Sequence, residues 1–291
     1  MISSSHSCAS TPALMSNAFT IDVEDWFQVA AFASVLDRKD WDRFECRVER
    51  NVDQLLQALD ENGVKATFFT LGWIAQRYPD MVRRIVAQGH ELASHGFAHH
   101  MIHELSREQF TDDVARAKTL LEQISGTSVI GYRAPSFSVG PRTLWALDIL
   151  AETGHRYSSS IYPIRHDLYG MPDAPRFAHE RNGLLEIPAT SVRWLGRNWP
   201  ASGGGYFRLL PYTWSKRSLS RVMQSDAQPA VFYCHPWEID PGQPRVRAAS
   251  LKSRFRHYIN QDRMLAKIDR LLSDFSWGPM RQVFSLEQPT V

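Results

Sequence analysis

Two histidines, His95 and His99, stand four residues apart in the segment His-Gly-Phe-Ala-His. On a helical turn this spacing points both imidazoles the same way, so that they can share one metal ion. The same spacing also occurs among surface histidines, and three further histidines stand nearby at positions 90, 100 and 103. The pair therefore indicates a metal site only in combination with other ligands.

Three carboxylates, Asp22, Glu24 and Asp25, lie at the end of an apolar segment. Asp25 suits a helix cap or a solvated turn. Asp22 still falls within the expected buried strand, where a carboxylate is costly unless it is paired or bound to a metal. Two histidines and one carboxylate form a metal site with open positions for water and substrate, which is typical of catalytic sites. A second carboxylate nearby can act as general base on a water molecule that the metal activates.

Two further polar residues, Arg133 and His235, follow apolar segments in the motifs RAPSF and CHPWE. A guanidinium at position 133 can orient a catalytic carboxylate and hold it ionised. A histidine at position 235 can protonate a leaving group, and Trp237 can form a wall of the pocket. Taken singly, Arg133 can also be a surface arginine, and His235 can also be a core histidine.

The elements that must position these residues alternate along the chain between strand and helix patterns, which predicts a parallel sheet or a barrel. Strands are expected at 19–23, 65–70, 90–93, 129–131, 184–187, 230–233 and 282–284, and helices within 52–62, 79–88, 106–125 and 141–153. Asp22, His95, Arg133 and His235 each fall at or just after a strand end. In βα-barrels the site is built at those C-terminal strand ends, so the four segments predict one shared site.

Other catalytic and binding classes lack their signals in this sequence. No Gly-x-Ser-x-Gly elbow occurs, which argues against a serine nucleophile. The glycines at 203–205 lack the spacing of a phosphate loop and, with Tyr206, are expected to form a loop that contacts substrate. The net charge of +2 is close to neutral, and the basic segment 245–263 is expected to be a solvated helical face, so no nucleic-acid partner is predicted.

The composition is that of an ordinary globular protein, with 43% hydrophobic and 22% charged residues in 291. Three cysteines without a CxxC pair do not make a disulfide framework, and no apolar stretch reaches the length of a membrane span. Residues 1–17 are rich in serine and alanine but lack the basic start and apolar core of a secretory signal. We therefore expect a disordered leader and a cytoplasmic location.

The motifs TIDVED, HGFAH, RAPSF and CHPWE resemble, in order and spacing, those of polysaccharide deacetylases, which are carbohydrate esterases with a NodB-homology domain. The phrases DVEDWFQV, SGGGYFRLLP and FYCHPWEIDPGQPR resemble more specifically the deacetylases of exosortase-linked (PEP-CTERM) exopolysaccharide loci. The resemblance implies a deacetylase domain over 18–155 and a C-terminal part, 156–291, that completes the barrel and carries the extension of this subgroup. The implied fold is of the α/β class, an irregular (β/α) barrel of about seven strands.

The same resemblance assigns roles to the singled-out residues. It implies that Asp22 is the catalytic base, that His95 and His99 bind the metal, that Arg133 pairs with the base and that His235 is the acid. Three aromatic residues are expected to contact the substrate, namely Phe137, Tyr206 and Trp237.

Two positions depart from the family pattern. Many members carry a second, metal-binding aspartate directly after the first, where Val23 stands here. Strand alternation places Glu24 on the same face as Asp22, so Glu24 is preferred as the third ligand, with Asp25 as the alternative. Relatives also usually carry an aspartate at Ser158, which supports the acidic histidine. Without an aspartate at position 158, we expect either weakened activity or another carboxylate, such as Glu238 or Asp240, in its place.

The implied activity is metal-dependent hydrolysis of N-acetyl groups on an N-acetylated exopolysaccharide or its lipid-linked precursor, with release of acetate. One divalent transition metal is expected, with zinc preferred, although such sites also accept cobalt, manganese or nickel. The alternatives are a hydrolase of another C–N bond, such as a cyclic amide, and a carbohydrate-binding pseudoenzyme, which the serine at position 158 favours.

Overall fold

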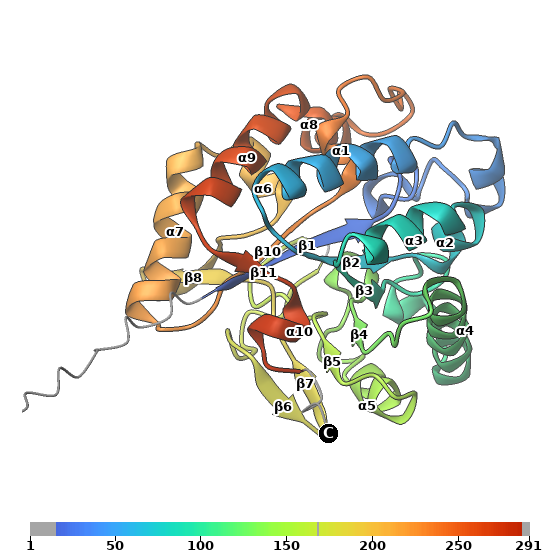
Figure 1. The fold of residues 1–291 in the computed structure, drawn as a ribbon, viewed down its shortest axis with the longest axis horizontal. Coiled ribbons are helices and arrows are strands. Elements are labelled where there is room, and N and C mark those ends of the chain that lie inside the picture. The colour runs from blue at the N-terminus through green and yellow to red at the C-terminus, as the bar shows by residue number, and fades with distance from the viewer. Residues whose placement is uncertain (1–15, 168, 287–291) are drawn as a thin grey trace, which may run out of the picture.

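The structure is a computed structural model that describes residues 16–167 and 169–286. One sheet dominates it, with strand order β10-β1-β2-β3-β4-β5-β7-β6 and with β11 pairing beside β1. The pairs are parallel except for the antiparallel pair β6–β7. The strands are β1 (Asn17–Val23), β2 (Thr67–Thr70), β3 (Glu91–Ser94), β4 (Gly131–Tyr132), β5 (Tyr157–Ser158), β6 (His179–Arg181), β7 (Leu184–Glu186), β10 (Val231–Cys234) and β11 (Trp277–Gly278). The sheet curls into a half-barrel, which confirms the predicted α/β class (Figure 1).

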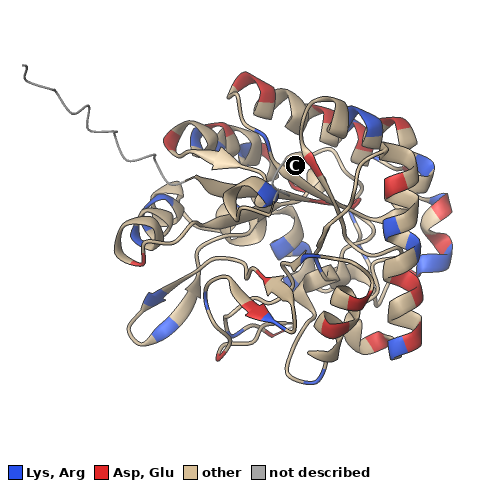
Figure 2. Ribbon diagram, turned by 60° about the horizontal axis from the view of Figure 1, so that its bottom comes forward, with Lys and Arg blue, Asp and Glu red and all other residues tan. Residues whose placement is uncertain are grey.

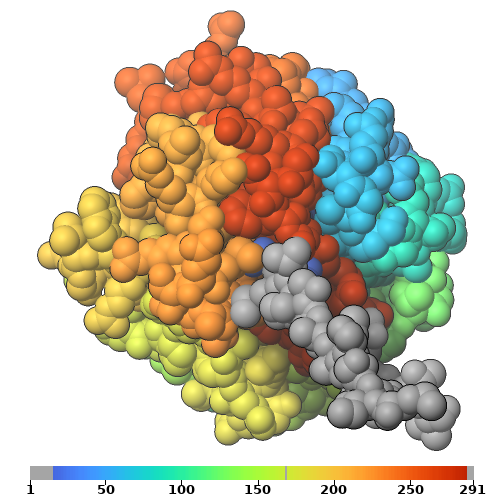
Figure 3. Space-filling view, turned by 60° about the vertical axis from the view of Figure 1, so that its left-hand side comes forward, coloured from blue at the N-terminus to red at the C-terminus, as the bar shows by residue number. Residues whose placement is uncertain are grey.

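Helices cover the outside of this sheet (Figure 1). They are α1 (Val48–Glu61), α2 (Gly72–Arg77), α3 (Pro79–Ala87), α4 (Arg107–Ser125), α5 (Trp145–Glu152), α6 (Gly204–Leu209), α7 (Tyr212–Ser225), α8 (Leu251–Tyr258), α9 (Met264–Asp274) and α10 (Met280–Val283). The largest core cluster joins apolar side chains of β1, β2 and β10 to those of α1, α7 and α9. Figure 3 shows α9 in red beside α1 in blue, so the two ends of the chain share this core.

Local sequence signals explain the clearest of these elements. Helix α4 starts at a capping box, in which Ser106 accepts from the backbone of Gln109 and the Gln109 side chain accepts from the backbone of Ser106. It stops at Gly126, whose φ of 68° is a left-handed conformation that glycine adopts without strain. Pro79 occupies the first turn of α3, as the sequence predicts.

Two expected boundaries differ from those of the structure. Strand β1 begins at Asn17, and residues 1–15 of the expected leader lie outside the described residues. The strand expected at 282–284 is wrong, because helix α10 occupies Met280–Val283 and β11 pairs with β1 instead. A short apolar run cannot distinguish a buried strand from one buried helical turn, and Pro279 at the N-cap favours the turn here.

The sequence did not predict the separate hairpin of β8 (Ser191–Trp194) and β9 (Arg197–Pro200). Basic and acidic residues are interspersed along the outer helices (Figure 2). Among the described residues, no helix has the length and apolar character needed to cross a bilayer.

Parallel pairing brings the C-terminal ends of β1, β3, β4 and β10 to one edge of the sheet. The long connection between β1 and α1 contains two 3-10 turns, η1 (Ala30–Phe32) and η2 (Arg38–Arg43). Its residues 29–31 line the cavity at this edge. The edge is therefore partly covered, and it is where the candidate site lies.

Candidate functional site

Three buried side chains, Glu24, His95 and His99, place one ligand atom each within 4.8 Å of one another. Glu24 follows β1 and His95 follows β3, and both strands pair in parallel with β2. His99 reaches the cluster from a loop and not from a helical turn, because Gly96 and His99 have φ angles of 76° and 52°. The backbone of this loop, rather than helical spacing, brings the two imidazoles together.

The surroundings of these atoms fit a cation. Glu24 Oε2 is buried and has no hydrogen-bond partner among the described residues, although His99 Nε2 lies 2.6 Å away. His95 Nδ1 lies 2.8 Å from the backbone oxygen of Arg133, which leaves its Nε2 for a ligand. Burial lowers the pKa of His95 to about 4, although Asp22 opposes this effect. A neutral imidazole is the form that binds a metal.

Arg133 holds Asp22 beside this cluster. Its Nη1 donates to Asp22 Oδ1 at 2.6 Å and to Thr20 Oγ1 at 2.7 Å, and both charged groups are buried. Ser159 accepts from Arg133 Nε through its backbone oxygen at 3.2 Å and from Nη2 through its hydroxyl oxygen at 3.0 Å. The guanidinium also lies 4.1 Å above the ring of Phe69. An arginine that donates to several acceptors at these distances fixes the orientation of the carboxylate.

His235 closes the other side of the site. Its Nε2 lies 3.9 Å from Asp22 Oδ2 and 3.7 Å from Glu24 Oε1. Its Nδ1 lies 3.2 Å from Glu238 Oε2. Burial alone would lower the pKa of His235, but Glu24, Glu238 and Asp22 outweigh it and raise the pKa to about 9. The imidazole is therefore positively charged at neutral pH and can donate a proton.

Glu238, the carboxylate beside His235, also forms a buried ion pair with Arg208. Glu238 accepts from the backbone N–H of His235 at 2.9 Å and from Arg208 Nε at 3.0 Å. The Arg208 side chain is fixed by three backbone carbonyls of residues 256, 257 and 259. A Cβ on Gly204 would run into the Glu238 carboxylate, so glycine is required there. The sequence offered Glu238 only as a substitute carboxylate and gave no indication of Arg208.

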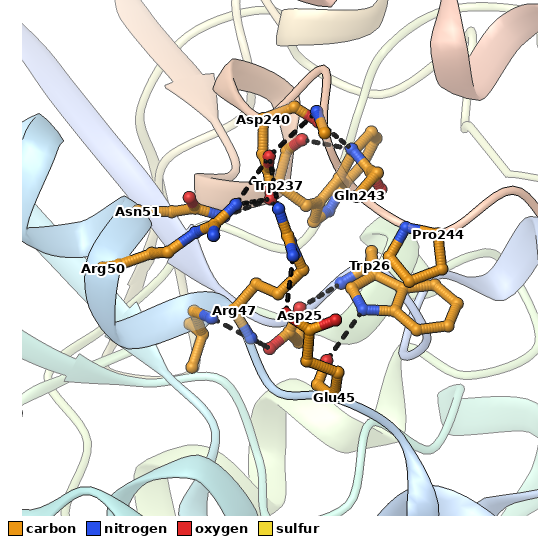
Figure 4. A network of polar contacts seen from close by, with 12 residues as sticks. Asp25, Trp26, Glu45, Arg47, Arg50, Asn51, Trp237, Asp240, Gln243 and Pro244 are labelled. Atoms are coloured by element: carbon orange, nitrogen blue, oxygen red, sulfur yellow. Dashed lines mark hydrogen bonds and ion pairs between the residues drawn. The ribbon is translucent and has the colours of Figure 1, made fainter.

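Asp25 lies outside the cluster (Figure 4). Its carboxylate accepts from the backbone N–H groups of Trp26, Arg47 and Val48 at 2.8, 2.6 and 2.9 Å. Arg47 in turn donates to Asp240 at 2.6 Å. Asp25 thus caps the start of α1 and anchors the connection that follows β1, while Asp240 is engaged with arginines and not with the acidic histidine. Of the two carboxylates expected as third ligand, the structure brings only Glu24 to the histidines.

A cavity of about 150 Å³ opens onto these groups. Phe137 and Trp237 line it, and the Trp237 Nε1 also donates to Glu24 Oε1 at 3.0 Å, so this tryptophan orients the carboxylate. Tyr206 lies instead in an adjoining cavity of about 530 Å³ that shares His235 and Trp237 with the first. Of the three expected substrate contacts, two thus line the catalytic cavity and one lines its neighbour.

Ser158 lies in the buried strand β5. Its hydroxyl donates to Ser160 Oγ at 2.7 Å, and Glu186 accepts from the backbone of Ser160 at 2.9 Å. Within the described part of the chain, no recorded contact joins Ser158 to His235. The negative charges next to the imidazole therefore come from Glu24, Glu238 and Asp22 and not from position 158.

Two family models match the sequence and together span most of it. Residues 40–158 match the model described as polysaccharide deacetylase. Residues 159–285 match a model described as a domain of unknown function, DUF3473. His235, Glu238 and Arg208 all belong to the second segment.

Curated relatives are named as deacetylases. A chitin deacetylase from Pestalotiopsis sp is 35% identical over 142 residues, which cover 48% of this chain and 47% of the relative. A peptidoglycan-N-acetylglucosamine deacetylase from Bacillus cereus is 28% identical over 82 residues, which cover 28% of this chain and 30% of the relative. The chain thus spans less than half the length of these two relatives.

The fold is shared with a solved structure over nearly the whole length of both chains. A crystal structure of a protein assigned as a polysaccharide deacetylase from Mycobacterium smegmatis superposes with a TM-score of 0.63. It covers 97% of this chain and 98% of its own, at 21% sequence identity. The half-barrel and its C-terminal part are therefore found together in another protein.

Proposed function

We propose that this protein, which contains a polysaccharide deacetylase domain, hydrolyses N-acetyl groups on an N-acetylated glycan and releases acetate. One observation carries the proposal. A buried set of metal-ligand atoms lies next to a carboxylate on one side, Asp22, and a charged imidazole on the other, His235. Amide hydrolysis needs an electrophilic centre, a base and an acid at these positions.

Glu24, His95 and His99 would hold one divalent transition metal. Two histidines and one carboxylate are typical of zinc in hydrolytic sites, and cobalt, manganese and nickel are the alternatives. When bound, such an ion polarises the acetyl carbonyl and lowers the pKa of water. The close approach of Glu24 Oε2 to His99 Nε2, at 2.6 Å, and the contact of His95 Nδ1 with a backbone carbonyl support this assignment.

The chain's own residues then move the protons. Asp22, held in place by Arg133, accepts a proton from the attacking water. His235 donates a proton to the departing sugar amine, and its raised pKa keeps that proton in place at neutral pH. Glu238 accepts from Nδ1 and so directs Nε2 toward the reacting groups. The products are acetate and an amino sugar.

The substrate class follows from the cavity and the relatives. Trp237 and Phe137 present aromatic surface beside the metal ligands, which suits the apolar face of a sugar ring. Relatives named as chitin and peptidoglycan-N-acetylglucosamine deacetylases support an N-acetylated polymer. The phrases shared with exosortase-linked deacetylases favour an exopolysaccharide or its lipid-linked precursor as that polymer.

The test is acetate release from oligomers of N-acetylglucosamine. Metal-free protein should release none, and added zinc or cobalt should start the reaction. Asp22→Asn should abolish it, whereas the exposed control Asp173→Asn should not. Binding of the oligomers without acetate release at any metal would instead identify a carbohydrate-binding pseudoenzyme. Ring opening of cyclic amides without acetate release would identify the other C–N hydrolase.

A further inference from the structure

The β8–β9 hairpin concentrates apolar surface that the chain leaves uncovered. Trp194, Leu195 and Trp199 are 47%, 79% and 41% exposed. They are three of the seven large apolar side chains that are exposed in the described part of the chain, and they lie within six successive positions. The two indole rings lie 6.2 Å apart, and that of Trp194 lies 6.1 Å from the ring of Trp214 on α7. The hairpin therefore presents one apolar surface beside α7 (Figure 1).

The tip of this hairpin goes against local backbone preference. Leu195 and Gly196 form its two-residue turn, with φ angles of 49° and 73°. Two positive φ angles are typical of a type I′ turn, whose first position favours asparagine, aspartate or glycine. Leucine is disfavoured in this conformation, and a side chain that is 79% exposed gains little from packing within the chain. Neither the turn nor the core explains this leucine, which favours an apolar contact outside the chain.

The sequence around the hairpin carries basic residues and no acidic ones. Residues 187–225 contain six basic residues and no Asp or Glu. Arg208 is buried in its ion pair with Glu238, and Lys216 pairs with Asp274 at 3.0 Å. Four arginines remain that are exposed and pair with no carboxylate among the described residues, namely Arg193, Arg197, Arg217 and Arg221. Positive charge that the protein does not neutralise therefore surrounds the apolar surface.

Two of these arginines lie along α7. Arg217 and Arg221 stand four residues apart, so they share one helix face, where like charges destabilise the helix. Together with hydroxyl and amide side chains of α7 they line a groove of about 530 Å³. Asp226, the acid that follows α7, pairs with Arg176 at 2.9 Å and does not line this groove. A groove of this composition fits a phosphate group, because guanidinium groups donate to phosphate oxygens.

We propose that the β8–β9 hairpin and the face of α7 that carries Arg217 and Arg221, together the hairpin–α7 face, bind the surface of a bilayer that contains anionic lipid. Tryptophan is enriched at membrane–water interfaces, and basic side chains are attracted to anionic headgroups. The leucine at the tip would enter the acyl boundary, and the arginines would contact lipid phosphates. A bilayer meets both requirements, since it has an apolar layer directly beneath a layer of phosphates.

Two other occupants fit this face less well. In a two-fold dimer the face would lie against its own copy, where the arginines of the two chains would repel one another. Single-stranded nucleic acid would pair with the arginines and stack on the indoles, but stacking leaves the exposed Leu195 unexplained. The inference goes beyond the proposed hydrolysis, because no residue of the hairpin or of α7 lines the catalytic cavity. Where both hold, the face would bring the enzyme to a lipid-linked glycan.

The test is co-sedimentation of zinc-loaded protein with vesicles of phosphatidylcholine, either alone or with about 30% phosphatidylglycerol. We expect binding to the anionic vesicles that added salt weakens. Leu195→Asn supplies a residue that the turn prefers, so it should keep or raise the melting temperature and still weaken vesicle binding by about tenfold. The double variant Arg217→Gln, Arg221→Gln should weaken binding by about ten- to thirtyfold, because each basic residue next to an anionic surface contributes a factor of about five.

Matched controls change the same residue types elsewhere. Leu251→Asn alters a leucine of α8 that is also 79% exposed, and the double variant Arg142→Gln, Arg247→Gln removes two exposed arginines that lie outside the hairpin and α7. Both should bind vesicles as the wild type does. Failure to bind anionic vesicles, or equal losses in the control variants, would overturn the inference.

Two further measurements identify the other occupants. Binding of a single-stranded DNA oligomer without binding of vesicles would identify a nucleic-acid surface and overturn the inference. A dimer in analytical ultracentrifugation that Leu195→Asn dissociates, again without vesicle binding, would identify self-association and also overturn it. Acetate release from soluble N-acetylglucosamine oligomers is measured separately and should be the same in the hairpin–α7 variants as in the wild type. Loss of vesicle binding with retained acetate release therefore bears on the membrane surface alone, and vesicle binding without acetate release bears on the hydrolase alone.

Discussion

Glu238→Gln removes the negative charge beside His235 and keeps the shape of the side chain. The glutamine oxygen can still accept from the backbone N–H and from Nδ1, which Glu238 Oε2 now meets at 2.9 and 3.2 Å. The variant loses the electrostatic stabilisation of the imidazolium, and it also loses the ion pair between Glu238 Oε1 and Arg208 Nε. We therefore expect the pKa of His235 to fall from its raised value of about 9.

The size of the fall follows from the distance. Two unit charges 3.2 Å apart attract by about 5 kcal/mol at an effective dielectric constant of about 20, or roughly 4 pKa units. This is an upper limit, because Arg208 at 3.0 Å neutralises part of the Glu238 charge. A fall of about 1 to 3 units is expected for the loss of one close opposite charge. Once a metal binds Glu24, Glu238 is the main carboxylate left to act on the imidazole.

The assay is kcat against pH with the pentamer of N-acetylglucosamine and zinc-loaded protein. His235 must be protonated to donate, so its pKa sets the alkaline limb of the profile. That limb should move to lower pH in Glu238→Gln, with little loss of activity on the acid side. The pKa of His235 is higher in the folded protein than its ordinary value of 6.5, so protonation of His235 stabilises the fold. This stabilisation is complete below pH 6.5 and is lost as the pH rises through about 9. In the variant this contribution to stability should be smaller and should be lost at a lower pH than in the wild type.

Two controls protect the interpretation. Asp240→Asn removes a neighbouring carboxylate that pairs with Arg47 and Arg50, and should leave the alkaline limb in place. Glu238→Gln leaves the buried Arg208 guanidinium without its counter-charge. We expect this loss to destabilise the fold by about 3–5 kcal/mol. The double variant Glu238→Gln, Arg208→Met removes both charges and should shift the limb in the same direction. An unchanged limb in a folded, zinc-loaded variant would show that Glu238 does not act on the acid, or that His235 is not the acid.

Three further outcomes are expected. Glu24→Gln should lose most of its zinc in elemental analysis, whereas Asp25→Asn should keep it. Asp25→Asn should instead lower the melting temperature, because the Asp25 carboxylate caps three backbone N–H groups. We expect the weakened cap to lower the free energy of unfolding by about 1–3 kcal/mol. Retained zinc in Glu24→Gln would contradict the ligand assignment. Asp22→Asn should keep the zinc and lower kcat by about two to four orders of magnitude. Gly204→Ala should lower both melting temperature and kcat, because its Cβ meets the Glu238 carboxylate; wild-type kcat would show that the close approach is not needed.

The elements that the sequence predicted best are those whose signals are local. The capping box at Ser106 and the glycine at position 126 mark both ends of α4, and a short, mostly apolar segment marks β1. Turn chemistry and periodicity need no knowledge of distant contacts. Strand β4 is only two residues long, and α10 replaces an expected strand, because pairing and packing with other elements decide such short segments.

The site was predictable where it depends on strand ends. Asp22, His95, Arg133 and His235 each end or follow a strand, and parallel pairing brings such positions to one edge. The helical turn expected at His95 and His99 was not found, since the backbone of that loop is set by its contacts. Only the folded structure distinguishes Glu24 from Asp25 as neighbour of the histidines.

The sequence offered Glu238 as one of two possible partners of the acid, but the pairing of Glu238 with Arg208 could not be deduced, because these two charges lie 30 residues apart. Arg208 stands in a segment that shows no apolar period around it, and nothing local indicates that its guanidinium is buried against three carbonyls. The requirement for Gly204 depends on the same contact. Long-range polar pairs of this kind leave no periodic pattern in a single sequence.

The position of this pair also explains how the site can tolerate a serine at position 158. A carboxylate on β5 would have to reach the imidazole from another strand, whereas Glu238 reaches back to His235 from the 3-10 turn that directly follows β10. That route needs space at Gly204 and a counter-charge from Arg208, and both come from α6. A supporting carboxylate on β5 is then unnecessary, and adding one would bury a second negative charge near Glu186. Changes in α6 should therefore affect catalysis as strongly as changes in the motif that contains the acid.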